Sequence, residues 1–79
     1  MAKKSAKRAN SFDQHVALRL RAKRAELGLT QTQLADVIGT TFQQVQKYEK
    51  GTNRISAGRL WQVAKCFNVP ITYFFEGLK

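Results

Sequence analysis

The sequence predicts an all-α fold of five helices, and two observations carry this prediction. Three segments begin with Ser or Thr followed three residues later by Gln, the pattern of a helix N-terminal capping box, and apolar residues at helical spacing follow each of them. No segment shows the alternation of apolar and polar residues that is typical of a strand. A length of 79 residues favours a single, compact domain with a thin core.

The first predicted helix spans Phe12–Leu27. Ser11 and Gln14 form the first capping pattern, because the serine can accept from the amide three residues on while the glutamine reaches back. Gly28 is suited to end the helix in a left-handed conformation. The apolar positions that recur at helical spacing are Val16, Leu20 and Leu27.

The next two predicted helices are short and close together. Thr30 and Gln33 form the capping pattern of the first, which Gly39 ends and whose apolar face consists of Leu34, Ala35 and Ile38. The second runs over about 42–50, with Thr41 and Gln44 as its capping pattern and Gly51 as its end.

Two further helices complete the expected fold. Ser56 is suited to cap the fourth helix, and Asn68 is suited to end it; its apolar positions are Leu60, Val63, Ala64 and Phe67. Pro70 is expected to open a short fifth helix, where its missing N–H costs nothing. Cys66, the only cysteine, lies in the apolar stripe and is expected to be a small core residue rather than a nucleophile.

The charge of the chain points to a polyanionic partner. It carries 14 Lys and Arg against 5 Asp and Glu, a formal net charge of +9. Nucleic acid is the first candidate partner and an anionic membrane surface the second. Residues 1–10 are basic and nearly free of apolar side chains, so we expect a flexible arm preceding a domain over 11–79. The arm either follows DNA phosphates or the minor groove, or only keeps the chain soluble.

Residues 31–50 combine the features that a helix-turn-helix requires. Gly39 permits the positive φ of the tight turn, and Ala35 is small where the two helices approach. The inner faces are apolar and comprise Leu34, Ile38, Val45 and Tyr48. Each feature is common alone, but their combination at this spacing between caps is specific.

This segment resembles the phage-repressor/Cro-type (XRE) family of helix-turn-helix regulators. Ala35, Gly39 and Val45 match the family's spacing, and the resemblance extends from Val16 to about Gly77. It implies a compact five-helix, lambda-repressor-like domain that binds double-stranded DNA as a homodimer, with two half-sites about one helical turn apart. A transcriptional repressor is the leading function. The alternatives are the DNA-binding antitoxin of a toxin–antitoxin pair and a protein-interaction adaptor that keeps the fold.

The third predicted helix is the one expected to enter the major groove. Val45 and Tyr48 point inward at about 100° per residue, which leaves polar side chains without acids on the opposite face. Gln can pair with adenine and Lys with guanine, so the expected base-reading residues are Gln43, Gln46 and Lys47. Phe42 is added as a mixed case, because its ring either contacts a thymine methyl or packs against the preceding helix.

Phosphate contacts are expected around this face. Gln31 is favoured because the free amides of a helix N-terminus point outward there. The other expected phosphate-binding residues are Thr41, Gln44, Lys50, Asn53 and Arg54. The family resemblance also implies an ion pair between Arg24 and Glu49 that holds the recognition helix, so Glu49 is structural and not a catalytic acid.

The remaining polar and aromatic residues indicate no enzyme. There is no paired carboxylate, metal-binding set or phosphate-cradling glycine loop, so no cofactor, metal or small-molecule ligand is expected. His15 is the only histidine and is expected at the surface. A dimer surface is expected in the C-terminal aromatic group, although core packing is the alternative for Trp61; the group consists of Trp61, Phe74, Phe75 and Leu78. No membrane span or signal peptide is evident, and we expect a cytoplasmic protein of a bacterium or phage, bound to the nucleoid through DNA.

Overall fold

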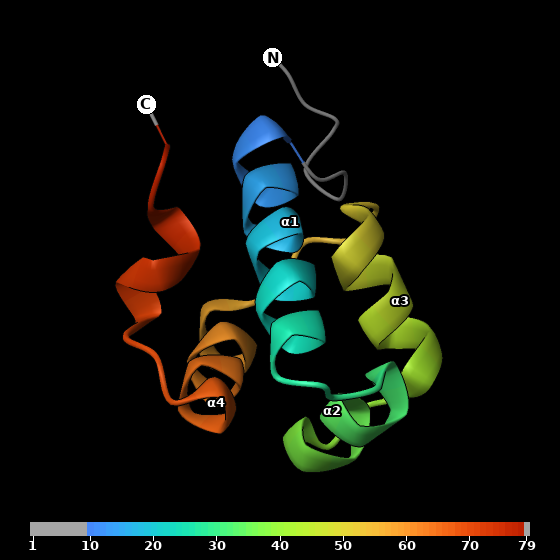
Figure 1. Ribbon diagram of the computed structural model, residues 1–79. Helices are drawn as coiled ribbons and strands as arrows, with labels where there is room; N and C mark the ends of the chain where they lie inside the picture. Colours follow the sequence, from blue (N-terminus) through green and yellow to red (C-terminus); the bar gives the residue numbers. More distant parts are fainter. Residues whose placement is uncertain (1–9, 79) are drawn as a thin grey trace.

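The computed structural model describes residues 10–78, and these residues form an all-helical domain (Figure 1). The expected arm over residues 1–9 and the final Lys79 lie outside the described residues. In chain order the elements are α1 (Ser11–Glu26), α2 (Gln31–Ile38), α3 (Phe42–Lys50), α4 (Ala57–Phe67) and the 3-10 helix η2 (Ile71–Phe75). No helix within this range is long and apolar enough to cross a membrane.

The fifth element corrects the prediction of five α-helices. It is a five-residue 3-10 helix, and Pro70 precedes it instead of forming its first residue. The amide of Tyr73 donates to the carbonyl of Pro70, which is the i→i+3 bond of a 3-10 turn. The backbone is already extended again at Glu76, so the segment is too short for a stable α-helical ladder.

The start of α1 also differs from the prediction. Asn10, which we assigned to the arm, is the N-cap in place of Ser11: its side chain accepts from the amide of Asp13, and the Asp13 carboxylate accepts from the amide of Asn10, both at 3.0 Å. A shorter acidic partner thus closes the box one residue earlier than Gln14 would. At the other end α1 stops before Leu27, which is 47% exposed, and Leu29 packs against the core instead.

The other helix ends follow the predicted residues. Thr30 and Gln33 form a complete capping box, whereas Thr41 accepts from the amide of Gln44 without a return bond. Ser56 caps α4 through the amide of Arg59. Left-handed conformations end α2, α3 and α4, in that order at Gly39, Gly51 and Asn68.

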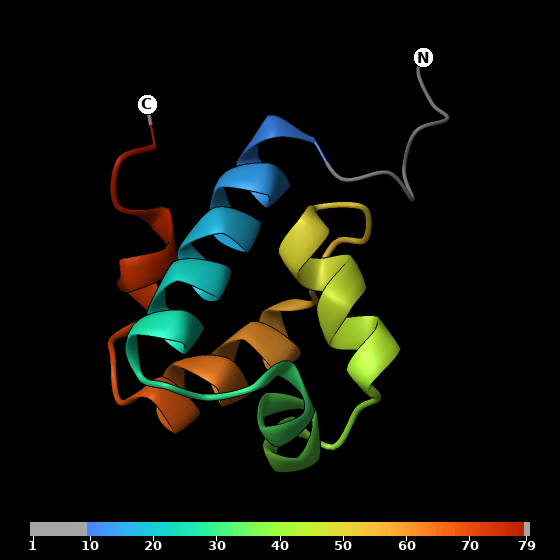
Figure 2. The ribbon, with the colours of Figure 1, turned by 45° about the vertical axis from the view of Figure 1, so that its right-hand side comes forward.

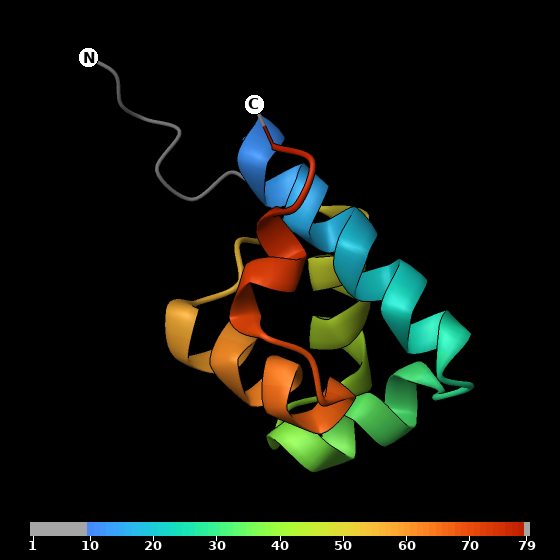
Figure 3. The same cartoon turned by 60° about the vertical axis from the view of Figure 1, so that its left-hand side comes forward.

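The core lies between α1 and the helices that surround it. Figure 2 shows α3 along one side of α1 and η2 along the other, and Figure 3 shows η2 lying between α1 and α4. Side chains from all five elements meet there, among them Leu20, Leu34, Val45, Val63 and Phe74. Helix α3 is therefore held by α1 and α2 on its inner side, which leaves its outer side to solvent.

Candidate nucleic-acid interface

The outer face of α3 presents the amide and ammonium groups that the sequence predicted there. Gln43, Lys47 and Lys50 are exposed, and Gln46 is half-buried. Val45 is fully buried and Tyr48 packs against the core, so the inward and outward sides of the helix are those expected from its periodicity. The structure therefore gathers three exposed polar side chains at i, i+4 and i+7 on one side of one helix.

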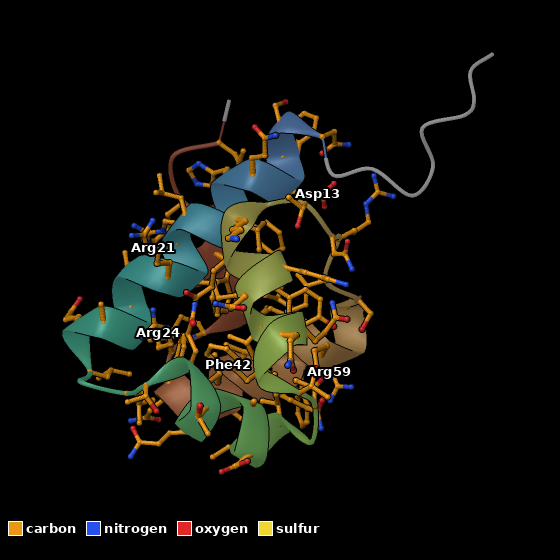
Figure 4. The ribbon with its side chains drawn as sticks, turned by 90° about the vertical axis from the view of Figure 1, so that its right-hand side faces the viewer. Asp13, Arg21, Arg24, Phe42 and Arg59 are labelled. Carbon is orange, nitrogen blue, oxygen red and sulfur yellow. The ribbon has the colours of Figure 1, made fainter. Side chains whose placement is uncertain are left out.

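Phe42 lies outside the core, at the first turn of α3 (Figure 4). It is 40% exposed and is one of several large apolar residues at the surface. Helical spacing puts it on the same side as Gln46 and Glu49, at i+4 and i+7. The ring therefore borders the outer face where α3 meets α2.

Glu49 is the buried acid that joins three helices. Its Oε2 accepts from Nε of Arg24 at 2.5 Å, and its Oε1 accepts from Nη2 of the same arginine at 3.0 Å. The same Oε1 accepts from Nε2 of Gln31 at 2.9 Å. Arg24 also donates from Nη1 to the carbonyl of Leu29 at 2.7 Å. The ion pair between Arg24 and Glu49 is thus present, and it fixes α3 against α1 and the start of α2.

Several residues predicted to bind phosphate have contacts that sequence reasoning did not foresee. Gln31 donates its amide to Glu49, as above, so its backbone N–H at the start of α2 is the group that faces outward. Arg54 is exposed, but its Nε donates to the Asp13 carboxylate at 3.0 Å. The hydroxyl oxygen of Thr41 caps α3 by accepting from the amide of Gln44. Gln44 and Asn53 are half-buried, and Lys50 is exposed.

Arg21, for which we predicted no role, lines a hollow beside these groups. The hollow has a volume of about 360 Å³ and lies where α1, α2 and α3 meet. Figure 4 shows Arg21 and Arg24 on α1 next to α3. The sequence contained an indication of this, since Arg21 lies three positions before Arg24 and residues at that spacing share one face of a helix. The lining residues are Arg21, Arg24, Gln31, Gln46, Glu49 and Lys50.

The C-terminal aromatic group divides between core and surface. Phe74 is completely buried and packs edge-on against Tyr73, so its assignment to a dimer surface is wrong. Trp61 and Phe75 are 55% and 43% exposed, and Leu78 is half-buried. Lys65 lies 4.7 Å from the centre of the Trp61 ring. The exposed members are compatible with a contact surface, although they lie on different elements.

A polar cluster unforeseen in the sequence anchors the C-terminal segment to α1. Arg19 donates from Nη2 to the Glu76 carboxylate at 2.6 Å and from Nε to the carbonyl of Tyr73 at 3.0 Å. His15 Nε2 lies 2.6 Å from the carbonyl oxygen of Glu76. His15 is therefore only partly exposed, and no local sequence pattern indicates a contact across 61 positions of the chain.

Burial raises the pKa of the partly buried Cys66 thiol, in keeping with a packing role.

Comparison with known proteins agrees with this geometry. The family model for the helix-turn-helix (HTH_3) matches residues 20–74. An uncharacterized HTH-type transcriptional regulator of Sinorhizobium medicae is 50% identical over 70 residues, covering 89% of this chain and 50% of that protein. An uncharacterized transcriptional regulator in the ATPase CF(0) region of Rhodospirillum rubrum is 55% identical over 67 residues, covering 85% and 62%. The chain thus spans about half the length of the curated relatives that it matches.

Solved structures share the fold at low identity. The restriction-modification controller protein C.AhdI of Aeromonas hydrophila superposes with a TM-score of 0.78 at 24% identity, covering 84% of this chain and all of that one. The clp gene regulator ClgR of Corynebacterium glutamicum gives a TM-score of 0.80 at 19% identity, covering 85% and 71%. At these identities the likeness concerns the arrangement of the helices.

Proposed function

Because the chain belongs to the XRE-type helix-turn-helix family of DNA-binding transcriptional regulators, we propose that it is a sequence-specific repressor whose α3 enters the major groove of DNA. The outer face of α3 carries the proposal. It presents Gln43, Lys47 and Lys50 without an exposed acid, beside a half-buried Gln46. These side chains supply the amide and ammonium donors that read base edges and bind phosphates.

The contacts of Glu49 support the same function. A recognition helix must keep its orientation while its outer face exchanges water for DNA. Glu49 ties α3 to Arg24 and Gln31, and its side chain is only 4% exposed. The charge of +9 favours a polyanionic partner, and salt-dependent binding is expected.

A homodimer is part of the proposal. Two copies would place two α3 helices in successive major grooves, about one helical turn apart. Trp61, Phe75 and Leu78 are the surface on which we place the contact, now without Phe74. A dimer of this kind reads a palindrome.

Selection of bound sequences from random duplex DNA tests the function. The purified protein is expected to enrich a palindromic motif at moderate salt. Binding of all sequences with equal affinity would contradict sequence-specific regulation. It would favour an adaptor that keeps the fold without base recognition.

The division between base-reading and phosphate-binding residues is tested on the selected motif. Gln43→Ala is expected to relax preference at one base position, at a cost of about 1–3 kcal/mol for the preferred base. Lys50→Ala is expected to weaken all sequences alike and to lower the salt dependence. Equal loss on every sequence for both variants, measured by fluorescence anisotropy, would mean that Gln43 reads no base.

A further inference from the structure

The hollow between α1, α2 and α3 contains cationic groups of two kinds. Three lining side chains are cationic, Arg21, Arg24 and Lys50, and one is acidic, Glu49. The charges of the lining therefore sum to +2. One kind already forms an ion pair with a carboxylate of the protein, and the other kind does not.

Arg24 is fully engaged within the protein. Its guanidinium donates to both oxygens of Glu49 and to the carbonyl of Leu29, and Gln31 occupies Oε1 of the same carboxylate. Because the pair is largely buried and its charges cancel, Arg24 is a poor direct ligand for a further anion. Its role in the hollow is to line it.

Arg21 and Lys50 are the other two cationic residues that line the hollow. Both are exposed, and neither forms an ion pair with any residue over 10–78. One belongs to α1 and the other to the last turn of α3. Two unmatched cations that face one hollow repel each other, so an anion between them is stabilised.

Gln31, the first residue of α2, also lines the hollow. Thr30 accepts from the amide of Gln33, while the first-turn amides of Gln31 and Thr32 have no acceptor within the helix. These N–H groups and the helix dipole favour a negative charge at this end. A tetrahedral oxyanion suits two cations beside the N-terminus of a helix.

We propose that the hollow binds one phosphate of the DNA backbone, held directly by Arg21 and Lys50, with Arg24 and Glu49 as its supporting pair. The inference rests on the proposed function, since the ligand is DNA. It assigns a binding role to Arg21 and removes Arg24 from direct contact. Because Gln46 borders both the hollow and the outer face of α3, this phosphate would set the depth of the helix in the groove.

Duplexes that carry a single neutral methylphosphonate test the inference. The selected motif is prepared with the substitution at each phosphate in turn, and affinity is measured for the unchanged protein, Arg21→Ala, and the control Lys23→Ala. The control removes the same charge from α1 at a side chain that lies over the Tyr73 ring and does not line the hollow. Circular dichroism checks that each variant remains folded.

One phosphate per half-site is expected to respond to Arg21. Neutralising it should weaken the unchanged protein and the control by roughly tenfold, and should weaken Arg21→Ala clearly less, since only Lys50 then contacts that phosphate. The salt slope of Arg21→Ala should fall by about 0.9, and Arg21→Lys should restore it. If every methylphosphonate weakens Arg21→Ala as much as the unchanged protein, the inference is wrong although DNA binding stands. Failure to select any motif would instead overturn the proposed function.

A free phosphate offers the same chemistry as the backbone and is tested separately. Inorganic phosphate is titrated against the DNA complex at matched ionic strength, with chloride as the reference. Equal effects of the two salts are expected. If phosphate competes better than chloride and Arg21→Ala abolishes the difference, the hollow is a site for a free anion and not for DNA.

Discussion

At the scale of single residues, Glu49 is the residue of α3 whose side chain connects this helix to both α1 and α2. Its two oxygens bind Arg24 from α1 and Gln31 from α2. The family resemblance implied the first contact, but the second requires the start of α2 to lie beside the end of α3. Sequence spacing alone does not measure that distance.

Glu49→Gln is expected to lower the free energy of unfolding by about 3 kcal/mol, because it leaves the Arg24 charge buried without its partner. Urea denaturation measures the change. Glu76→Gln is the matched control, since it breaks the pair with Arg19 at a carboxylate that is 63% exposed, and should cost less than about 1 kcal/mol. Equal losses in the two variants would contradict the structural role of Glu49.

Cys66 provides a second residue-scale prediction. Burial disfavours the thiolate and raises the pKa of the thiol, so the folded protein should form thiolate at higher pH than the unfolded chain does. The rate of iodoacetamide alkylation, measured against pH with and without urea, reports this difference. The free energy of unfolding should therefore decrease as the pH rises above the pKa of the thiol in the unfolded chain. Superimposable pH profiles in the two states would rule out the shift.

At the scale of the elements, caps and glycines decide where each helix begins and ends. The prediction of α2 succeeded because its box, Thr30 with Gln33, is closed by local bonds. The prediction of α1 chose Ser11 although Asn10 and Asp13 have the same three-residue spacing, and the two local patterns compete over one turn. The terminal segment Ile71–Phe75 is a 3-10 helix. The residues of this segment that the rest of the protein holds, the buried Phe74 and Tyr73 with its bond from Arg19, span too few positions for an α-helix.

Gly39→Ala and Gly58→Ala are expected to change stability in opposite directions. A Cβ at either glycine meets no atom within 4 Å, so backbone conformation alone decides. Gly39 has φ of +73°, where an L-residue costs about 1–2 kcal/mol. Gly58 lies within α4, where alanine should add about 0.5–1 kcal/mol.

Thermal unfolding of both variants measures the two signs. A Gly39→Ala variant as stable as the unchanged protein would show that the α2–α3 turn does not require a left-handed residue. Loss of stability in Gly58→Ala would show instead that the open space beside α4 is needed. The two outcomes test the turn and the helix independently.

At the scale of the whole molecule, the exposed apolar groups raise the question of self-association. Trp61 and Phe75 are exposed, whereas Phe74 is buried in the core. Exposed rings of this size favour a contact surface when they lie together. The proposed dimer places them there.

Trp61→Asp is expected to weaken the dimer by about tenfold or more, since it puts a charge into an apolar contact. Sedimentation equilibrium measures the dissociation constant. Val37→Asp is the control, because this side chain on α2 is also highly exposed but belongs to no proposed contact. Similar association constants for the two variants would place the dimer surface elsewhere.

The sequence by itself determined the four α-helices, the turn at Gly39 and the polar outer face of α3, because caps, glycine conformations and helical periodicity act over a few residues. Only the tertiary structure decided that Leu27 is exposed, that Phe74 is core and that Arg54 meets Asp13. It also decided that Arg21 and Lys50 face one hollow. These contacts join helices that are distant in the chain, and the distance between their side chains depends on how the core packs.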